Sequence, residues 1–222
     1  MNELLKQIET CIEFGKINNA SAYPPNMKGQ DGADELTQKA LQVGISPGDV
    51  LNEALIPGMD KVGQKFSENK IFVPQMLMSA NAMNAAMQHI KPFFQSGAVK
   101  RKGTFIIGTV AGDLHDIGKN LVAMMIEGAG WEVIDLGVDI KSEQFIEAIK
   151  EHPHCAVGLS ALLTTTMVNM EKIVLDIKSF SDKVKVLIGG APVNTDFCKK
   201  IGADHYSPDP QGAVAYLNGL AQ

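Results

Sequence analysis

The second half of the chain alternates short apolar runs with segments of helical length, and this alternation limits the possible folds more than any other feature. Each run is continuous, as in TFIIGTV, which is the pattern of a parallel strand buried on both faces. The predicted strands are residues 104–110, 132–136, 155–159, 184–188 and, more weakly, 204–206. Strands that alternate with helices in this way predict a doubly wound, five-stranded parallel sheet of Rossmann or flavodoxin type.

The first ninety or so residues carry only helical patterns. Apolar residues recur at helical spacing over residues 2–14 and 34–43, and a loop rich in Gly, Asn and Pro separates these segments. Ser46 is placed to cap a third helix, and Pro57 inside that helix should bend it. Pro74 opens a fourth helix. Four amphipathic helices predict a four-helix bundle ahead of the sheet.

A charged segment, KPFFQSGAVKRK, interrupts the helical pattern after the bundle. We therefore expect three parts: a helical cap domain over residues 1–91, a linker over 92–102 and an α/β domain over 103–222.

Composition and charge argue against several classes of protein. The formal net charge of −5 leaves no basic stripe for nucleic acid. No apolar run has the roughly 18 residues of a membrane span, and the N-terminus lacks the apolar core of a signal peptide, so a cytoplasmic location without membrane or nucleic-acid partners is expected. The three cysteines are odd in number and far apart, which favours neither a disulfide framework nor a thiolate zinc site.

Unusual residues follow three of the predicted strands: GDLHDIG the first, SALLTTT the third and GG the fourth. The carboxyl ends of parallel strands meet at one edge of a sheet, where ligands bind. We therefore expect these segments to form one site. Its candidate residues are Gly112, Asp113, Leu114, His115, Asp116, Ile117, Gly118, Ser160, Leu162, Thr164, Thr166, Gly189 and Gly190.

His115 and Asp113 are the residue types of a metal ligand and its partner. A neutral imidazole binds borderline metals well, and its second N–H usually donates to a carboxylate that fixes tautomer and orientation. In an extended loop, side chains two residues apart point the same way. An isolated Asp-x-His is common by chance, however, and would then be a capped helix start or a solvent-facing loop.

The three segments together resemble a known signature. Asp113-x-His115-x-x-Gly118, then Ser160-x-Leu162, then Gly189-Gly190 is similar to the pattern of cobalamin-binding domains that hold the corrinoid base-off with a protein histidine on cobalt. The first half resembles the helical cap of methionine synthase and of the small corrinoid proteins of methanol, methylamine and aromatic O-demethylase systems. The matching residues there are Gly58, Met59, Val62, Gly63, Phe66, Phe72, Pro74 and Gln75.

The resemblance implies a role for each candidate. His115 would be the axial cobalt ligand, Asp113 its hydrogen-bond partner and Thr166 the next group in the relay, where methionine synthase has serine. Ser160 and Thr164 would hydrogen-bond the displaced base or nucleotide tail, with Leu162 packed beside them. The glycines, which lack a Cβ, would let the backbone approach the macrocycle and its tail. The residues that would shield the opposite face of cobalt are Phe72, Met76 and Met83.

The function implied by the resemblance is that of a methyl carrier loaded with cobalamin or methylcobalamin. A donor-specific methyltransferase would place a methyl group on cobalt, and an acceptor methyltransferase would pass it to tetrahydrofolate, coenzyme M or a similar acceptor. A reductive activator is a further implied partner. Such a chain is the corrinoid subunit of a methyltransferase system rather than a complete catalyst, and its sequence does not identify the methyl donor.

Other interpretations remain beside this one. A mutase cobalamin subunit shares the Asp-x-His loop but generally lacks a helical cap, and a cobalamin-dependent light-sensing regulator needs a DNA-binding domain. A phosphoacceptor receiver has the same sheet but requires an acidic pair after the first strand, where His115 separates Asp113 from Asp116, and a lysine after the last, where residues 206–208 have none. The methionines of the fourth helix are, on residue type alone, more often core than a cofactor lid.

Overall fold

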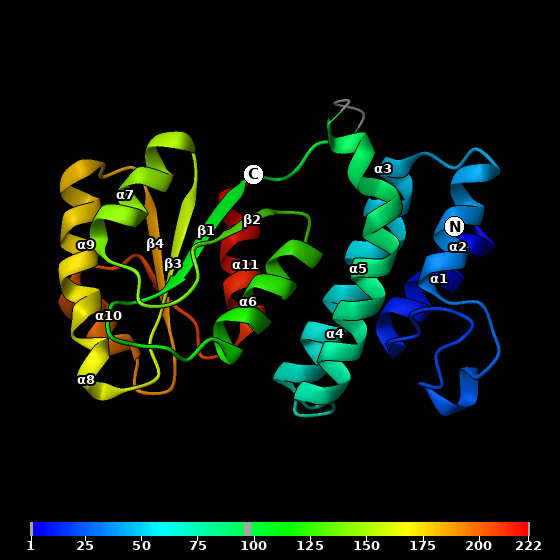
Figure 1. Ribbon diagram of the computed structural model, residues 1–222, viewed down its shortest axis with the longest axis horizontal. Helices are drawn as coiled ribbons and strands as arrows, with labels where there is room; N and C mark the ends of the chain where they lie inside the picture. The colour runs from blue at the N-terminus through cyan, green and yellow to red at the C-terminus, as the bar shows by residue number, and fades with distance from the viewer. Residues whose placement is uncertain (1, 96–98, 222) are drawn as a thin grey trace. The chain divides into compact units, whose positions relative to one another are not determined.

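The computed structural model describes residues 2–95 and 99–221. The chain divides into two compact units (Figure 1). The first, the helical unit, comprises Met1–Arg101 and Gly128–Gly130. The second, the α/β unit, comprises Lys102–Glu127 and Trp131–Gln222. Within the described residues, no helix is both long and apolar enough to cross a membrane.

The helical unit is a bundle, as the apolar spacing predicts. Its helices α1, α2, α4 and α5 pack on one another around a core of apolar side chains, because each presents a stripe of apolar residues at helical spacing. The bounds of the elements are α1 Glu3–Phe14, a 3₁₀ turn Pro25–Met27, α2 Ala33–Gln42, α3 Pro47–Val50, a π-helical segment Leu51–Leu55, α4 Ile56–Ser67 and α5 Val73–Gln95.

The third predicted helix begins and bends where the sequence indicates. The Ser46 hydroxyl accepts a hydrogen bond from the backbone N–H of Asp49 at 3.0 Å, which caps α3. A π-helical turn over Leu51–Leu55 then separates α3 from α4. Pro57 has no N–H to donate to the carbonyl one turn earlier, so the wider turn lies directly before it.

The fourth predicted helix runs further than its pattern indicates. We expected a linker from Pro92 onward, but α5 continues to Gln95 with Pro92 inside it. A proline removes one helical hydrogen bond, and contacts made further along the chain stabilise the turn that contains it. The N–H of Val99 donates to the Phe93 carbonyl at 3.2 Å, and the Arg101 guanidinium lies 4.3 Å from the centre of the Phe94 ring. Residues 96–98 of the predicted linker lie outside the described part of the chain.

The α/β unit has the predicted parallel sheet, in the order β2-β1-β3-β4-β5. Helices α7, α9 and α10 lie on one face of the sheet, and α6 and α11 lie on the other (Figure 1). The strands are β1 Thr104–Thr109, β2 Glu132–Asp135, β3 Ala156–Ser160, β4 Lys185–Gly189 and β5 His205–Tyr206. The helices are α6 Ile117–Gly128, α7 Ser142–Glu151, α8 Thr164–Met167, α9 Asn169–Phe180, α10 Thr195–Ile201 and α11 Pro210–Leu220.

The register of the three central strands positions the motif segments. Thr109 at the end of β1 pairs with Ser160 at the end of β3, and Ser160 pairs with Gly189 at the end of β4. All three strands therefore end at one level. Because β1 leads to β2 on one side and adjoins β3 on the other, this edge is also where the strand order reverses, the usual ligand site of such a sheet.

Candidate functional site

The His115 loop, residues 110–116, joins β1 to α6 at this edge of the sheet. Its backbone turns at Gly112, whose φ of +80° is a conformation that side chains disfavour. The Asp113 N–H then donates to the Val110 carbonyl at 3.1 Å. The Thr109 hydroxyl, from the end of β1, donates to the His115 carbonyl at 3.0 Å. The loop is thus tied to the strand that precedes it.

Asp113 is fully buried and accepts hydrogen bonds on both carboxylate oxygens. On Oδ1 the donors are Nδ1 of His115 at 2.7 Å and the His115 backbone N–H at 3.1 Å. On Oδ2 they are the Thr166 hydroxyl at 2.6 Å and the backbone N–H groups of Leu162 and Leu163 at 2.8 and 3.3 Å. The structure therefore brings together Asp113 and His115, which stand two residues apart, and Thr166, which only the resemblance had joined to them.

This environment determines the charge of Asp113. Burial opposes ionisation, but the hydrogen bonds from the Thr166 hydroxyl and from the backbone amides of His115 and Leu162 outweigh it and hold the pKa of Asp113 well below its usual range. An ionised carboxylate only accepts, so Nδ1 of His115 carries the proton that joins them. The Nε2 atom is then the ring nitrogen available to a metal, and about half of the His115 side chain is exposed.

Exposed apolar side chains lie on the segments that hold Asp113 and His115. Leu114 and Ile117 are 71% and 72% exposed, and Leu162 and Leu163 are also exposed. A Cβ added at Gly118 would meet no described atom within 4 Å. A histidine with a free Nε2, on a segment that carries exposed leucine and isoleucine and has open space at Gly118, fits a large, partly apolar group that carries a metal. The residues present therefore fit a corrinoid.

The adjacent glycines at the end of β4, Gly189 and Gly190, differ in the contacts that limit a side chain there. Gly190 has a φ of +128°, and a Cβ there would lie 1.9 Å from the Ala161 carbonyl oxygen. Gly190 is therefore required for the loops after β3 and β4 to approach each other. A Cβ at Gly189 would meet only the Ser207 carbonyl oxygen, at 3.6 Å, which is an ordinary contact. Ser160 ends β3 in register with Gly189, and Thr164 begins α8 with its side chain exposed.

The candidates in the helical unit divide by exposure. Phe72 precedes α5 and is 63% exposed, and its backbone N–H donates to Oε1 of Gln75 at 3.1 Å. Met76 and Met83, by contrast, are buried. Burial of the two methionines matches the alternative that they are core residues. Of the three, Phe72 has the exposed surface that a shielding residue needs.

Two polar side chains that sequence reasoning missed also hold the His115 loop. Asp139 accepts a hydrogen bond from the Gly112 N–H at 2.6 Å, and Asn169 donates to the Ala111 carbonyl at 2.7 Å. Asp139 follows β2, a strand end from which we had selected no residue, and the location of that strand end was the available signal. Asn169 carries no comparable signal, because its helical position alone does not indicate what its side chain contacts.

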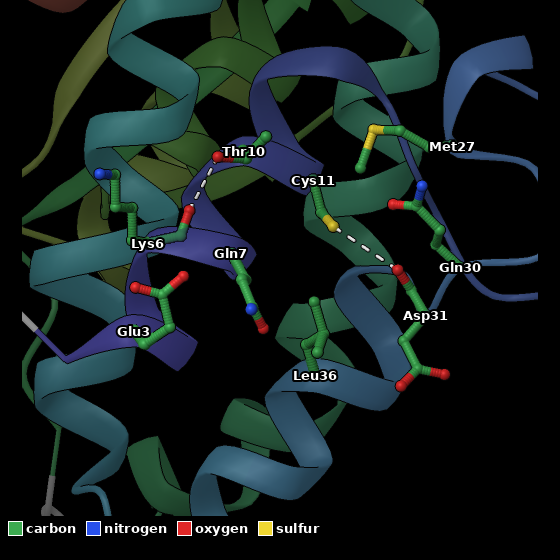
Figure 2. Close-up of a pocket in the computed structure, with 9 residues that line it drawn as sticks. All are labelled: Glu3, Lys6, Gln7, Thr10, Cys11, Met27, Gln30, Asp31 and Leu36. Atoms are coloured by element: carbon green, nitrogen blue, oxygen red, sulfur yellow. Dashed lines mark hydrogen bonds between the residues drawn. The ribbon is translucent and has the colours of Figure 1, made fainter.

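A cavity of about 400 Å³ lies elsewhere, in the helical unit (Figure 2). It is lined by residues of α1, the loop after α1 and the start of α2. Cys11 lies in its wall, with the thiol 3.9 Å from the Asp31 carbonyl oxygen. Burial raises the pKa of the Cys11 thiol to about 11, so this sulfur is not a thiolate at neutral pH. The residues selected from the sequence do not line this cavity.

Comparison with protein families gives matches in both halves of the chain. A family model described as a B12 binding domain matches residues 103–215. A second model, also described as a B12 binding domain, matches residues 30–91.

Several characterised proteins are similar over most of their length. The trimethylamine corrinoid protein of Methanosarcina barkeri is 42% identical over 187 residues, which cover 82% of this chain and 86% of the relative. The dimethylamine corrinoid protein of the same organism is 40% identical over 221 residues, covering 98% and 97%.

Solved structures agree with these matches. The methanol:cobalamin methyltransferase complex MtaBC of Methanosarcina barkeri contains a chain with a TM-score of 0.82 and 29% identity, and the match covers 99% of this chain and 80% of that one. A cobalamin-binding protein from Desulfitobacterium hafniense DCB-2 gives a TM-score of 0.72 and 30% identity, with 98% of each chain covered.

Proposed function

This chain belongs to the B12-binding corrinoid proteins of methyltransferase systems, and from that membership we propose that it holds cobalamin base-off, with His115 on cobalt, and carries a methyl group between two methyltransferases. Cobalamin is its cofactor. When bound, cobalamin supplies a cobalt ion that accepts a methyl group and later releases it. The proposal is supported above all by the hydrogen bond of 2.7 Å between Asp113 and Nδ1 of His115.

The protein's own residues orient the His115 imidazole, which is the proposed cobalt ligand, and hold the proton on its Nδ1 atom. Asp113 keeps the proton of His115 on Nδ1, so the lone pair of Nε2 faces outward for the cobalt ion. Thr166 donates to Asp113 and keeps that carboxylate ionised and in place.

The remaining candidates form the walls of the site in this proposal. Leu114, Ile117 and Leu162 present apolar surface beside the ring. Ser160 and Thr164 hydrogen-bond the nucleotide tail, and Gly189 leaves room for it. Gly112, Asp116 and Gly118 line the side of the site that is formed by the His115 loop and the start of α6. Phe72, which is largely exposed, would shield the cofactor, whereas Met76 and Met83 are buried in the helical unit and would act only through its packing.

We propose a methylated amine as the class of methyl donor. The relatives at 42% and 40% identity are named for trimethylamine and dimethylamine. The partners are then a donor-specific methyltransferase for the amine, an acceptor methyltransferase of the tetrahydrofolate or coenzyme M type and a reductive activator.

Absorbance spectroscopy tests the cofactor site. The wild-type protein, His115→Ala and His154→Ala are reconstituted with hydroxocobalamin, and the unbound corrinoid is removed. His154 is an exposed histidine outside the site and is the matched control. We expect the wild type and His154→Ala to retain corrinoid with a histidine-ligated spectrum, which His115→Ala lacks. Retention of that same spectrum by His115→Ala would refute the assignment of the ligand.

A further inference from the structure

The peptide group between Ala111 and Gly112 is held at both of its ends. Its carbonyl oxygen accepts a hydrogen bond from Nδ2 of Asn169 at 2.7 Å. Its N–H donates to Oδ1 of Asp139 at 2.6 Å. Asn169 begins α9, and Asp139 lies in the loop between β2 and α7. Two side chains from separate segments therefore fix one peptide plane, and we call this arrangement the 111–112 clamp.

The 111–112 clamp acts directly before the pair that carries the chemistry. Gly112 connects the held peptide to Asp113, and its φ of +80° is one that glycine adopts and leaves freely. The loop sequence itself thus does little to prevent rotation of this peptide. The backbone N–H of Asp139 also donates to the Asp113 carbonyl, at 3.1 Å. Asp139 therefore holds the backbone at the peptide before Gly112 and at the peptide after Asp113.

The conformation of Asp139 supports a positioning role. Its φ is +58°, in the left-handed region, where a residue other than glycine is held by its surroundings at some cost. Its side chain is exposed, and that of Asn169 is half-buried. Neither side chain fills the apolar core, so what their polar atoms contribute is the hydrogen bonding of the loop.

From this geometry we propose that Asp139 and Asn169 are positioning residues, which set the angle at which His115 presents Nε2 by fixing the Ala111–Gly112 peptide, one residue ahead of Asp113. The inference rests on the proposed function, because His115 must be the cobalt ligand for the angle to matter. A loop that is already fixed before the cofactor binds does not lose conformational entropy on binding. Residues that hydrogen-bond around a metal ligand without touching the metal usually affect metal affinity strongly.

Three variants test the two hydrogen bonds of the 111–112 clamp while leaving the fold of the protein intact. Asp139→Gly keeps the left-handed backbone and removes the acceptor. Asp139→Asn retains Oδ1, and asparagine tolerates the same backbone, so it is the conservative control. Asn169→Ala removes the donor from a helical position that favours alanine. A thermal melt of each apo-protein confirms that the variant is folded before binding is compared.

Two measurements are made on each protein. Titration with hydroxocobalamin gives the dissociation constant and, at saturation, the fraction with a histidine-ligated spectrum. We expect Asp139→Gly and Asn169→Ala to raise the dissociation constant about tenfold and to lower that fraction, while Asp139→Asn stays near the wild type. Hydrogen exchange at the Gly112 amide, measured by NMR in the apo-protein, should accelerate in Asp139→Gly and not in Asp139→Asn.

The outcomes distinguish this inference from the function on which it rests. Wild-type binding and a wild-type histidine-ligated fraction in Asp139→Gly and Asn169→Ala would overturn the positioning role. If the wild type itself fails to retain corrinoid, the proposed function fails instead. The Gly112 exchange rate still decides whether the 111–112 clamp exists, because that measurement needs no cofactor.

Discussion

The hydroxyl of Thr166 donates a hydrogen bond to Oδ2 of Asp113 across 2.6 Å, from a position 53 residues later in the chain. Thr166 lies in α8, after β3, and Asp113 lies in the loop after β1. The two meet because β1 and β3 are parallel neighbours that end at the same level. The relay beneath His115 is therefore a product of the sheet topology.

Removal of the Thr166 hydroxyl should destabilise the protein and weaken the cofactor site. Thr166→Val keeps the shape of the side chain but takes a donor from a buried carboxylate, so we expect the free energy of unfolding to fall by about 2 kcal/mol. Thr166→Ser retains the hydroxyl and should lose less than half of that. Urea denaturation of the apo-proteins measures both values. Equal losses in the two variants would assign the effect to packing.

Stability should depend on pH through Asp113. Its pKa is lower in the folded protein than in the unfolded chain, so its contribution is fully present above the unfolded pKa, near 4, and is lost as pH falls toward the folded pKa. Asp113→Asn cannot titrate at this position. The difference in unfolding free energy between wild type and Asp113→Asn should be constant above about pH 5 and shrink in acid. A difference that does not change in acid would contradict this expectation.

Gly189, the last residue of β4, and Gly190, which follows it, should respond differently to substitution by alanine. Gly190→Ala places a Cβ 1.9 Å from the Ala161 carbonyl oxygen at a positive φ, so we expect a loss of more than about 3 kcal/mol. Gly189→Ala makes only an ordinary contact at 3.6 Å and should change stability by less than about 1 kcal/mol. The same urea titrations measure both.

Corrinoid binding by Gly189→Ala then reports on the cofactor alone, because this variant should be folded. If the nucleotide tail passes beside Gly189, the added methyl group should weaken binding. Binding equal to that of the wild type would show that the tail lies elsewhere.

Alanine substitutions at Phe72 and Met76 should distinguish a residue that shields the cofactor from one that packs in the core. Phe72 is largely exposed and Met76 is buried. Phe72→Ala should cost about 0.5 kcal/mol or less but shorten the lifetime of bound methylcobalamin under illumination. Met76→Ala should cost about 3 kcal/mol through its cavity and leave that lifetime nearer the wild-type value. A longer lifetime in Phe72→Ala than in Met76→Ala would count against a shielding role for Phe72.

The fold followed from the sequence where the signal was local. Each predicted strand of the sheet matches an observed one, because a strand buried on both faces must be apolar at consecutive positions. The end of α5 did not follow. Pro92 locally favours the end of a helix. The contacts of Phe93 and Phe94 with residues 99–101 come from the three-dimensional path of the chain after α5, which the local sequence does not specify.

The site was predictable to the extent that its residues form a compact motif. Asp113 and His115 stand two positions apart, and the resemblance to cobalamin-binding domains added Thr166. Asn169 escaped because its contact with the backbone of another segment leaves no periodicity or spacing in the sequence, and Asp139 escaped because we selected no residue from the strand end that it follows. Gly190 was assigned to the cofactor, yet its missing Cβ is required by the Ala161 backbone.

Electron paramagnetic resonance of the corrinoid-loaded protein tests most directly whether His115 is the cobalt ligand. With the bound cofactor reduced to its paramagnetic Co(II) form, the nuclear spin of an axial nitrogen splits the signal, and the splitting pattern depends on the isotope. The protein is prepared with nitrogen-15 histidine and unlabelled cobalamin. We expect the triplets of the unlabelled protein to become doublets, and the labelled His115→Ala variant to show no such doublets. Triplets that persist in the labelled wild type would show that the cofactor's own base remains on cobalt, and would contradict the account.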